Sequence, residues 1–187
     1  MVGTASAQSD RPGSVRIVDF GTSGAGCPDG SVDASIIHDG QQLFVGFDKL
    51  AVQTVPGGPP VGQKKCHLRV KMEFDPAWSL SLGSVDYRGA AILTAGVKGV
   101  QRSSYFFGGM LPRDDAFATT ELTGPFDGNY SRRDDMALLL FSHCGPGTHN
   151  LMIHAEIRVS GGEGLMTVDS TTQQTQHVYD LRWKRCH

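Results

Sequence analysis

The stretch CHLRVKMEF, Cys66 to Phe74, alternates apolar and polar side chains at every position. Successive side chains of a β-strand point to opposite faces, so this pattern predicts a strand with one buried face and one solvent-exposed face. Leu151 to Val159 repeats the alternation, and so does His177 to Cys186. The more apolar face of the last stretch holds Tyr179, Leu181 and Trp183. The sequence therefore indicates a chain built from amphipathic strands.

The rest of the chain divides into short strands separated by turns. Its 24 glycines and 9 prolines are scattered throughout, which favours many short segments over a few long helices. Strands are predicted at Val15–Phe20, Val32–Ile37, Leu43–Phe47, Trp78–Tyr87, Ala90–Leu93, Val97–Phe107 and Ala137–Phe141. Turns are predicted at Asp39-Gly40, Pro56-Gly57-Gly58, Gly108-Gly109, Gly145-Pro146-Gly147 and Gly161-Gly162. About ten strands at this spacing indicate an all-β fold, an antiparallel, jelly-roll-like β-sandwich of two packed sheets.

The length of 187 residues fits one domain with a substantial core. We assign residues 15–187 to a single β-sandwich domain. Residues 1–14 are interpreted as a disordered tail or the remnant of a signal peptide, because Ala5-Ser6-Ala7 resembles a small-residue cleavage site. Leu111 to Thr123 shows no alternation and is predicted to form a long surface loop.

Four cysteines, Cys27, Cys66, Cys144 and Cys186, lie far apart in the sequence. Zinc sites need close spacings such as Cys-x-x-Cys, so we expect two disulfides formed in an oxidising compartment rather than a metal site. Four cysteines allow three pairings, and free buried thiols are the alternative. We favour Cys27 with Cys66 and Cys144 with Cys186, since each pair then closes one self-contained stretch.

A glycosylation sequon, Asn129-Tyr130-Ser131, directly follows Asp127-Gly128, which is predicted to form a turn. A turn would expose Asn129, the predicted acceptor of the glycan. Together with the long-range cysteines, the sequon indicates passage through the secretory pathway and an extracellular location.

Charge and motifs argue against several classes of function. The net charge of -2 offers no basic face for nucleic acid, and no apolar run is long enough to cross a membrane. His143, His149 and His154 lack carboxylates at matching positions, so no metal site is predicted. Gly21 to Gly26 fits neither a phosphate loop nor a nucleophile elbow and is interpreted as a connecting turn. Solvated turns are predicted at the mixed-charge clusters Arg113–Asp115 and Arg132–Asp135.

The segment from Trp78 to Phe107 combines aromatic side chains with basic ones. Aromatic faces with a few hydrogen-bond donors suit a flat, oxygenated, apolar ligand. Core packing is the alternative for each single aromatic residue. As a group, these residues are predicted to form a pocket.

Several short motifs resemble one protein family. They are Gly26-Cys27-Pro28 with Gly30, Lys65-Cys66, Val85-Asp86-Tyr87-Arg88-Gly89, Ala95-Gly96-Val97 with Gln101, Gly124 to Tyr130, Ser142-His143-Cys144-Gly145 and Leu181 to Cys186. Over residues 20–186 the chain resembles DUF4360, a family of small secreted fungal and bacterial proteins. The resemblance implies a secreted β-protein that keeps all four cysteines, and it implies no particular activity.

The chain also looks similar to the intermolecular hetero-Diels-Alderases of tropolonic sesquiterpene biosynthesis, which join a tropolone-derived quinone methide to a humulene-type alkene. That resemblance implies a cofactor-independent enzyme that holds two small, apolar, oxygenated molecules and controls stereochemistry. Orientation and one preorganised donor would supply the catalysis. Under this hypothesis the cavity is lined by Trp78, Tyr87, Tyr105, Phe107 and Trp183. The donors to the tropolone oxygen would be Arg88, Lys98 or Arg102.

Two other functions stay open. One is a non-catalytic secreted binding protein, either an effector or a binder of cell walls or glycans. The other is a protease inhibitor with an exposed loop at Leu111 to Thr123. No cofactor, metal, nucleic-acid partner or membrane partner is expected for any of the three.

Overall fold

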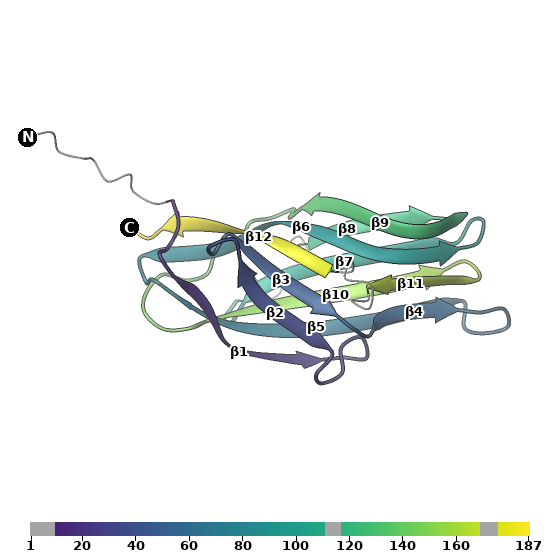
Figure 1. The fold of residues 1–187 in the computed structure, drawn as a ribbon, viewed down its shortest axis with the longest axis horizontal. Coiled ribbons are helices and arrows are strands. Elements are labelled where there is room, and N and C mark those ends of the chain that lie inside the picture. Colours follow the sequence, from purple (N-terminus) through teal and green to yellow (C-terminus); the bar gives the residue numbers. More distant parts are fainter. Residues whose placement is uncertain (1–9, 111–116, 169–175) are drawn as a thin grey trace, which may run out of the picture.

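The computed structural model describes residues 10–110, 117–168 and 176–187. These residues form twelve β-strands without a helix, and every strand pair is antiparallel (Figure 1). The strands build two sheets that pack face to face, so the antiparallel β-sandwich that the alternation predicts is confirmed.

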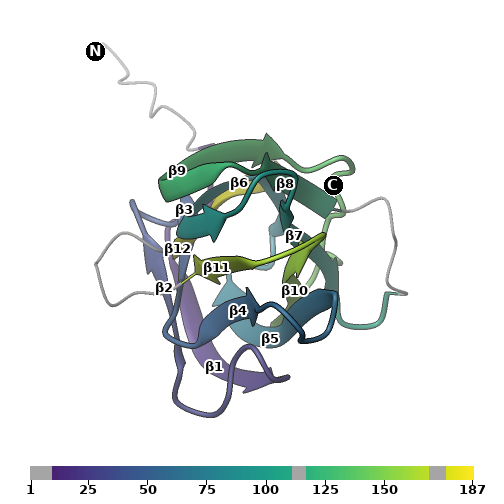
Figure 2. The same cartoon turned by 90° about the vertical axis from the view of Figure 1, so that its right-hand side faces the viewer.

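A five-stranded sheet and a seven-stranded sheet form the two layers (Figure 2). The five-stranded sheet has the order β1 (Val15–Ser23), β5 (Val61–Phe74), β10 (His149–Ser160), β7 (Lys98–Phe107) and β8 (Phe117–Thr123). The main path of the seven-stranded sheet is β2 (Val32–Ile37), β3 (Gln42–Phe47), β12 (Gln176–Arg185), β6 (Trp78–Leu93), β11 (Gly164–Val168) and β4 (Leu50–Thr54). Its seventh strand, β9 (Phe126–Asp135), pairs with β6 and lies at the edge of the sheet.

Alternating residues of the strands meet between the two sheets and form the core. The apolar side chains of the CHLRVKMEF stretch in β5 are buried, as predicted. The apolar set of Leu151 to Val159 in β10 is at most 2% exposed. In β12, Tyr179 and Leu181 are buried and Trp183 is partly buried, which confirms the predicted face of the last strand.

Two predicted segments differ from the structure because tertiary contacts override the local pattern. Trp78–Tyr87 and Ala90–Leu93 are one continuous strand, β6. Ala137–Phe141 is predicted to be a strand, but it forms no strand, and only a single backbone bond, from the Ala137 amide to the Phe117 carbonyl (3.2 Å), is found between it and β8. The hydroxyl of Tyr105 accepts a hydrogen bond from the Leu140 amide (2.9 Å) and lies 3.1 Å from the Leu138 carbonyl. A buried side chain thus replaces a strand partner for this segment.

β8 corrects part of the predicted surface loop. Phe117–Thr123 pairs with β7, while residues 111–116 of that loop lie outside the described residues. Its inward positions are Ala118, Thr120 and Leu122, so only one of the three is a large apolar residue. Thr120 is buried with its hydroxyl 2.5 Å from the Asp134 carboxylate. Burial therefore alternates along β8, but the hydrophobicity of its residues does not.

β9 corrects two predicted turns, since Asp127-Gly128 and Arg132–Asp135 both lie within it. β9 is an edge strand in which Tyr130 alone is fully buried, so it carries no apolar alternation that a sequence pattern could reveal. The Arg133 guanidinium fixes it to the sheet by contacting Asp86 at 2.6 Å and also Asp180. β4 and β11 are two further short strands that were not predicted.

Both predicted disulfides are confirmed. Cys27 is bonded to Cys66 in β5, with Cα atoms 5.2 Å apart, and Cys144 is bonded to Cys186, with Cα atoms 5.9 Å apart. The first bridge ties the turn after β1 to its neighbouring strand. The second ties the segment that precedes β10 to the end of β12, and so links the two sheets.

A chain of buried polar side chains crosses the core between the sheets. The hydroxyl of Tyr130 in β9 donates to the Gln101 amide oxygen in β7 (2.5 Å), and the Gln101 amide nitrogen lies 2.5 Å from Nε2 of His177 in β12. His177 Nδ1 lies 3.0 Å from the hydroxyl of Tyr179, which lies 2.7 Å from Ser103 Oγ. Each group finds a partner away from water, as buried polar groups require.

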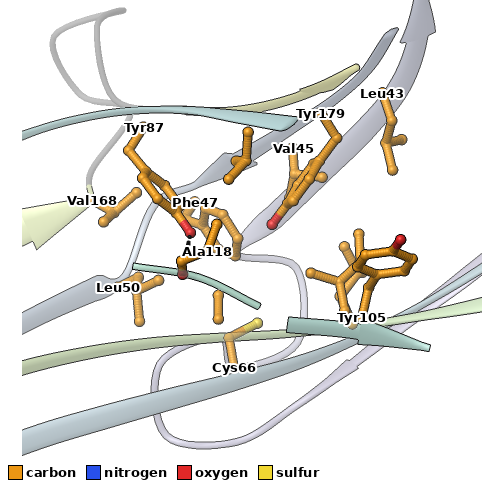
Figure 3. Close-up of a cluster of buried hydrophobic side chains, with 14 of the residues drawn as sticks. Leu43, Val45, Phe47, Leu50, Cys66, Tyr87, Tyr105, Ala118, Val168 and Tyr179 are labelled. Carbon is orange, nitrogen blue, oxygen red and sulfur yellow. Dashed lines mark hydrogen bonds between the residues drawn. The ribbon is translucent and has the colours of Figure 1, made fainter. Parts of the chain in front are cut away.

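The direction of these hydrogen bonds fixes the protonation of His177. Because the Gln101 amide donates to Nε2, this nitrogen must be unprotonated, and the ring carries its hydrogen on Nδ1. His177 is completely buried, with Phe47 and Tyr87 at its ring edges. Burial lowers the pKa of His177 to about 3 and raises that of Tyr179. Figure 3 shows Tyr87 and Tyr179 among buried apolar side chains of the core.

We expect the protein to lose stability in acid through His177. Its pKa when folded is about 3, below the ordinary 6.5, so its contribution is fully present above pH 6.5 and is lost as the pH falls towards 3. The free energy of unfolding should fall by about 1.4 kcal/mol per pH unit in this window. Urea denaturation at several pH values measures it. His177→Gln should be less stable at pH 7 but show a flatter pH profile, and an unchanged slope in this variant would contradict the assignment.

We also expect the Cys144–Cys186 bridge to contribute substantially to stability. It closes a loop with a sequence separation of 42 residues, for which the chain-entropy model gives about 4 kcal/mol. The double variant Cys144→Ala and Cys186→Ala should lose about that much in urea denaturation. A double variant as stable as the parent would show that the bridge does not constrain the unfolded chain.

Candidate functional site

The predicted cavity residues lie mainly in the core rather than around a cavity. Tyr87, Tyr105 and Phe107 are at most 1% exposed. Figure 3 shows Tyr87 and Tyr105 within a cluster of buried apolar side chains. The Tyr87 hydroxyl donates to the Ala118 carbonyl (3.0 Å), and the Tyr105 hydroxyl lies 2.9 Å from Ser81 Oγ. The two tyrosine hydroxyls therefore form hydrogen bonds within the protein, and the three rings fill the space between the sheets.

The two tryptophans contact other residues. Trp78 is buried beneath the Arg185 guanidinium, which lies 4.6 Å from the centre of its ring. Trp183 is partly buried, and its indole N–H donates to the Gly40 carbonyl (2.9 Å). The structure thus does not bring the five predicted aromatic residues together around one space.

The predicted donors point away from these aromatic side chains. Arg88 follows the inward Tyr87 in β6 and lies on the outer face of the seven-stranded sheet. Lys98 and Arg102 are on the outer face of the five-stranded sheet, since Gln101 beside them points inwards. Strand alternation therefore separates the predicted donors from the predicted cavity.

Three rings form a strip across the outer face of the five-stranded sheet. The imidazoles of His67 in β5 and His154 in β10 are stacked, with centroids 4.3 Å apart and planes at 25°. The Phe106 ring in β7 meets His154 edge-on at 5.3 Å and 86°. We call these three residues the ring strip. The register explains it, because His154 is paired with His67 on one side and with Ser104 on the other.

Charged side chains flank the ring strip. Arg102 in β7 lies 4.4 Å above the centre of the Phe117 ring in β8. Between Arg102 and Lys65, Glu156 accepts a hydrogen bond from Gln63 (2.6 Å) and lies 3.5 Å from the Lys65 ammonium. Lys65, Arg102, Glu156 and the two histidines border a hollow of about 210 Å³.

Burial is the main cause of a lowered pKa for His154, and nearby His67 and Lys65 lower it further. The His154 ring is therefore mainly neutral at pH 7, with an exposed stacking partner. A neutral imidazole can donate from one nitrogen and accept at the other. The ring strip consequently combines flat surface with polar edges.

This arrangement suits binding of a ligand with an apolar face and polar rim. A sugar ring has such a shape, with C–H groups on its faces and hydroxyls around its edge, so it can lie on a ring platform while charged neighbours bond to its hydroxyls. Among the described residues no three His, Cys, Asp or Glu side chains come together in a way that could hold a metal ion.

Other candidate positions offer less. A hollow of about 400 Å³ beside Trp183 is bordered largely by polar side chains such as Arg182 and Gln42, and its Asp180 is already engaged by Gln42 and Arg133. Another, of about 280 Å³, lies beside Arg88 and the predicted glycan acceptor Asn129, which is exposed on β9.

His149 is buried between other rings. It stacks on Phe74 at 4.2 Å, and His143 lies 4.5 Å away. Burial, followed by the charge of His143, lowers the pKa of His149. Its ring nitrogens have no hydrogen-bond partner among the described residues.

Sequence reasoning placed His67 and His154 on solvent-exposed strand faces but did not bring them together. The two are far apart in the chain, and their proximity depends on the β5–β10 register. Phe106 was assigned to the aromatic pocket segment without a face. The alternation of faces along β7 could have located it, because this alternation places Phe106 outside and Phe107 inside.

Solved structures that match this chain include carbohydrate-binding modules. A module described as TmCBM61, in complex with β-1,4-galactotriose, is 13% identical, and the match covers 91% of this chain and 90% of that chain with a TM-score of 0.29. A family 11 module from Clostridium thermocellum, in complex with a mixed-linked tetrasaccharide, is 9% identical, with coverage of 89% and 88% and a TM-score of 0.27.

A relative in Arthroderma benhamiae, described as an uncharacterized secreted protein, is 31% identical over 182 residues. These cover 94% of this chain and 73% of the relative. The description of this relative as secreted agrees with the predicted secretory or extracellular location. Within the described residues, no helix is long and apolar enough to span a membrane. The family model named DUF4360, a domain of unknown function, matches residues 13–186, and the chain belongs to this family.

Proposed function

We propose that this secreted protein is a non-catalytic glycan binder that takes its ligand on the outer face of the five-stranded sheet. The observation that carries the proposal is the ring strip of His67, His154 and Phe106, which lies on a solvent-facing sheet with polar groups beside it. Isolated exposed rings are common, but here His154 contacts a ring on each side, and the three rings cross three adjacent strands as a continuous platform.

The shape of this platform favours an extended ligand. β5, β10 and β7 are adjacent, and the step from His67 to Phe106 crosses two strand spacings, about 10 Å. This length exceeds one sugar ring. Because the strands are held by ladders of backbone hydrogen bonds, the platform is formed before the ligand arrives, which lowers the entropy cost of binding.

The cycloaddition hypothesis lacks corresponding support. It needs aromatic walls and a donor around one enclosed space, but the described residues place Tyr87, Tyr105 and Phe107 in the core and Arg88 outside it. An open sheet face would not hold two small apolar molecules away from water. We therefore favour the binding function over catalysis.

Replacing Phe106 and His154 together by alanine should weaken glycan binding about tenfold or more, because the ring platform is lost. A glycan array first identifies a soluble ligand, and calorimetry then compares dissociation constants. Both residues point outwards, so thermal denaturation should confirm that the variant folds.

Ile92→Ala is the matched control for this experiment. Ile92 is 52% exposed on the outer face of the seven-stranded sheet, so its truncation removes exposed apolar area from the opposite layer. It should leave the dissociation constant unchanged. Equal weakening by both variants, or an array on which the parent protein binds no glycan, would refute the proposal.

A glycan on Asn129 should leave binding intact. Asn129 pairs with Ala90, whose side chain faces outwards from the seven-stranded sheet, so the glycan would extend from the layer opposite to the ring strip. When the protein is secreted from a eukaryotic host, the intact mass should fall by one N-linked glycan in Asn129→Gln. The affinity of that variant should equal that of the parent. An unchanged mass would show that the sequon is not used.

A further inference from the structure

We infer that the ligand of this face is a neutral glycan that presents two hydroxyls on neighbouring ring carbons to the carboxylate of Glu156; the inference rests on the proposed glycan-binding function. Glu156 lies on the outer face of β10, two residues from His154. Its side chain is 31% exposed and borders the hollow beside the ring strip. The carboxylate is therefore within reach of a sugar that lies on the ring strip.

Two residues of β5 hold the Glu156 carboxylate in place. The Gln63 amide donates to Oε1 (2.6 Å), and the Lys65 ammonium lies 3.5 Å from Oε2. The strand register explains these contacts, because Glu156 is paired directly with Lys65 and lies diagonal to Gln63. Each oxygen of an ionised carboxylate can accept about two hydrogen bonds. These contacts therefore leave one acceptor position on each oxygen for a ligand.

Two acceptor positions this close together match two adjacent hydroxyls of a sugar ring. They match them in the same way that a carboxylate matches the paired N–H groups of a guanidinium. Hydrogen bonds to a charged acceptor are stronger than those between neutral groups. A hydroxyl that donates to Glu156 can also accept a hydrogen bond from the Lys65 ammonium, which has three donors. A ring on which only isolated hydroxyls are available cannot form both bonds to the carboxylate.

The charges of Lys65 and Glu156 balance each other and favour a neutral ligand. They lie 3.5 Å apart and carry opposite signs. Arg102, also on the border of the hollow, has partners of its own, the Phe117 ring among them. A sugar carboxylate would be repelled by Glu156, and the ammonium of an amino sugar would be repelled by Lys65. An uncharged sugar avoids both costs.

The spacing of Glu156 and His154 suits one sugar ring. Residues two apart on a strand are separated by about 7 Å, so a ring seated against the His154 imidazole extends its edge towards Glu156. The hollow of about 210 Å³ lies at this place and is bordered by both residues. The ring strip would thus supply the surface on which the sugar lies, and Glu156 would select its hydroxyls.

The test compares glycans that differ in the pair of hydroxyls. Cellopentaose and β-1,4-linked mannopentaose carry adjacent hydroxyls on every ring. Laminaripentaose lacks the pair on its internal rings because of its linkage, and methylated cellopentaose keeps the linkage of cellopentaose but loses the hydroxyl donors. Calorimetry measures dissociation constants at about 50 mM and about 300 mM NaCl. We expect a pentasaccharide with the pair to bind about tenfold more tightly than both comparison ligands, with little dependence on salt.

Glu156→Gln should weaken binding of that pentasaccharide about tenfold and remove most of its advantage over laminaripentaose. The reason is that one of the two acceptor oxygens becomes an amide nitrogen, which donates. Glu121→Gln is the matched control, because Glu121 is exposed on β8 of the same sheet and is not on the border of the hollow. This control should leave the dissociation constants unchanged, and thermal denaturation checks that both variants fold.

The outcomes separate the two proposals. Equal affinity for all the pentasaccharides, lost in the double alanine variant of Phe106 and His154, would overturn the selection of adjacent hydroxyls and keep the glycan-binding function. Failure of every pentasaccharide to bind would overturn the inference, and an array without a bound glycan would overturn both proposals. An equal loss with Glu121→Gln, or affinity that falls about tenfold with salt, would also overturn the inference.

Discussion

The hydrogen-bonded link between Gln101 and His177 is the constraint on which the arrangement of the two sheets depends. Gln101 belongs to β7 in one layer and His177 to β12 in the other, and both side chains are completely buried. Tyr130 in β9 is hydrogen-bonded to Gln101, and Tyr179 in β12 is hydrogen-bonded to Ser103 in β7. An apolar core tolerates small shifts of one sheet over the other, but this chain of directed bonds allows one placement.

That placement also determines what the protein shows to solvent. A slip of one residue in a strand would exchange its inner and outer faces, burying charged residues and exposing the polar link. Gly89 illustrates how closely the parts fit: a Cβ atom at this position would lie 2.5 Å from the Tyr130 hydroxyl. Because β7 is fixed through Gln101 and Ser103, the intervening Arg102 must face outwards. The core link therefore positions a residue of the ring-strip face without touching it.

Sequence reasoning predicted the parts of this structure that depend on local pattern. The strict alternation from Cys66 to Phe74 and from Leu151 to Val159 was sufficient to identify β5 and β10, and the separation of the cysteines favoured the pairing observed. It failed where burial depends on distant partners. Thr120 in β8 can be buried because its hydroxyl donates a hydrogen bond to the Asp134 carboxylate. β9 is held to the sheet by the Arg133 ion pair rather than by apolar residues. For the same reason, rings that are remote in sequence, such as His67 and His154, could not be recognised as one site.

The predicted aromatic pocket failed for a different physical reason. Buried tyrosines need hydrogen-bond partners, and in this fold Tyr87 and Tyr105 find them on the backbone of neighbouring segments. Their polarity, which makes them good candidates for a binding site, is used to satisfy the core. The outward positions of β5, β10 and β7 are free of that requirement. Substitutions there change the rings and charges offered to a ligand while the buried link and both disulfides stay unaltered, so the ligand preference of the face can vary independently of the stability of the sandwich.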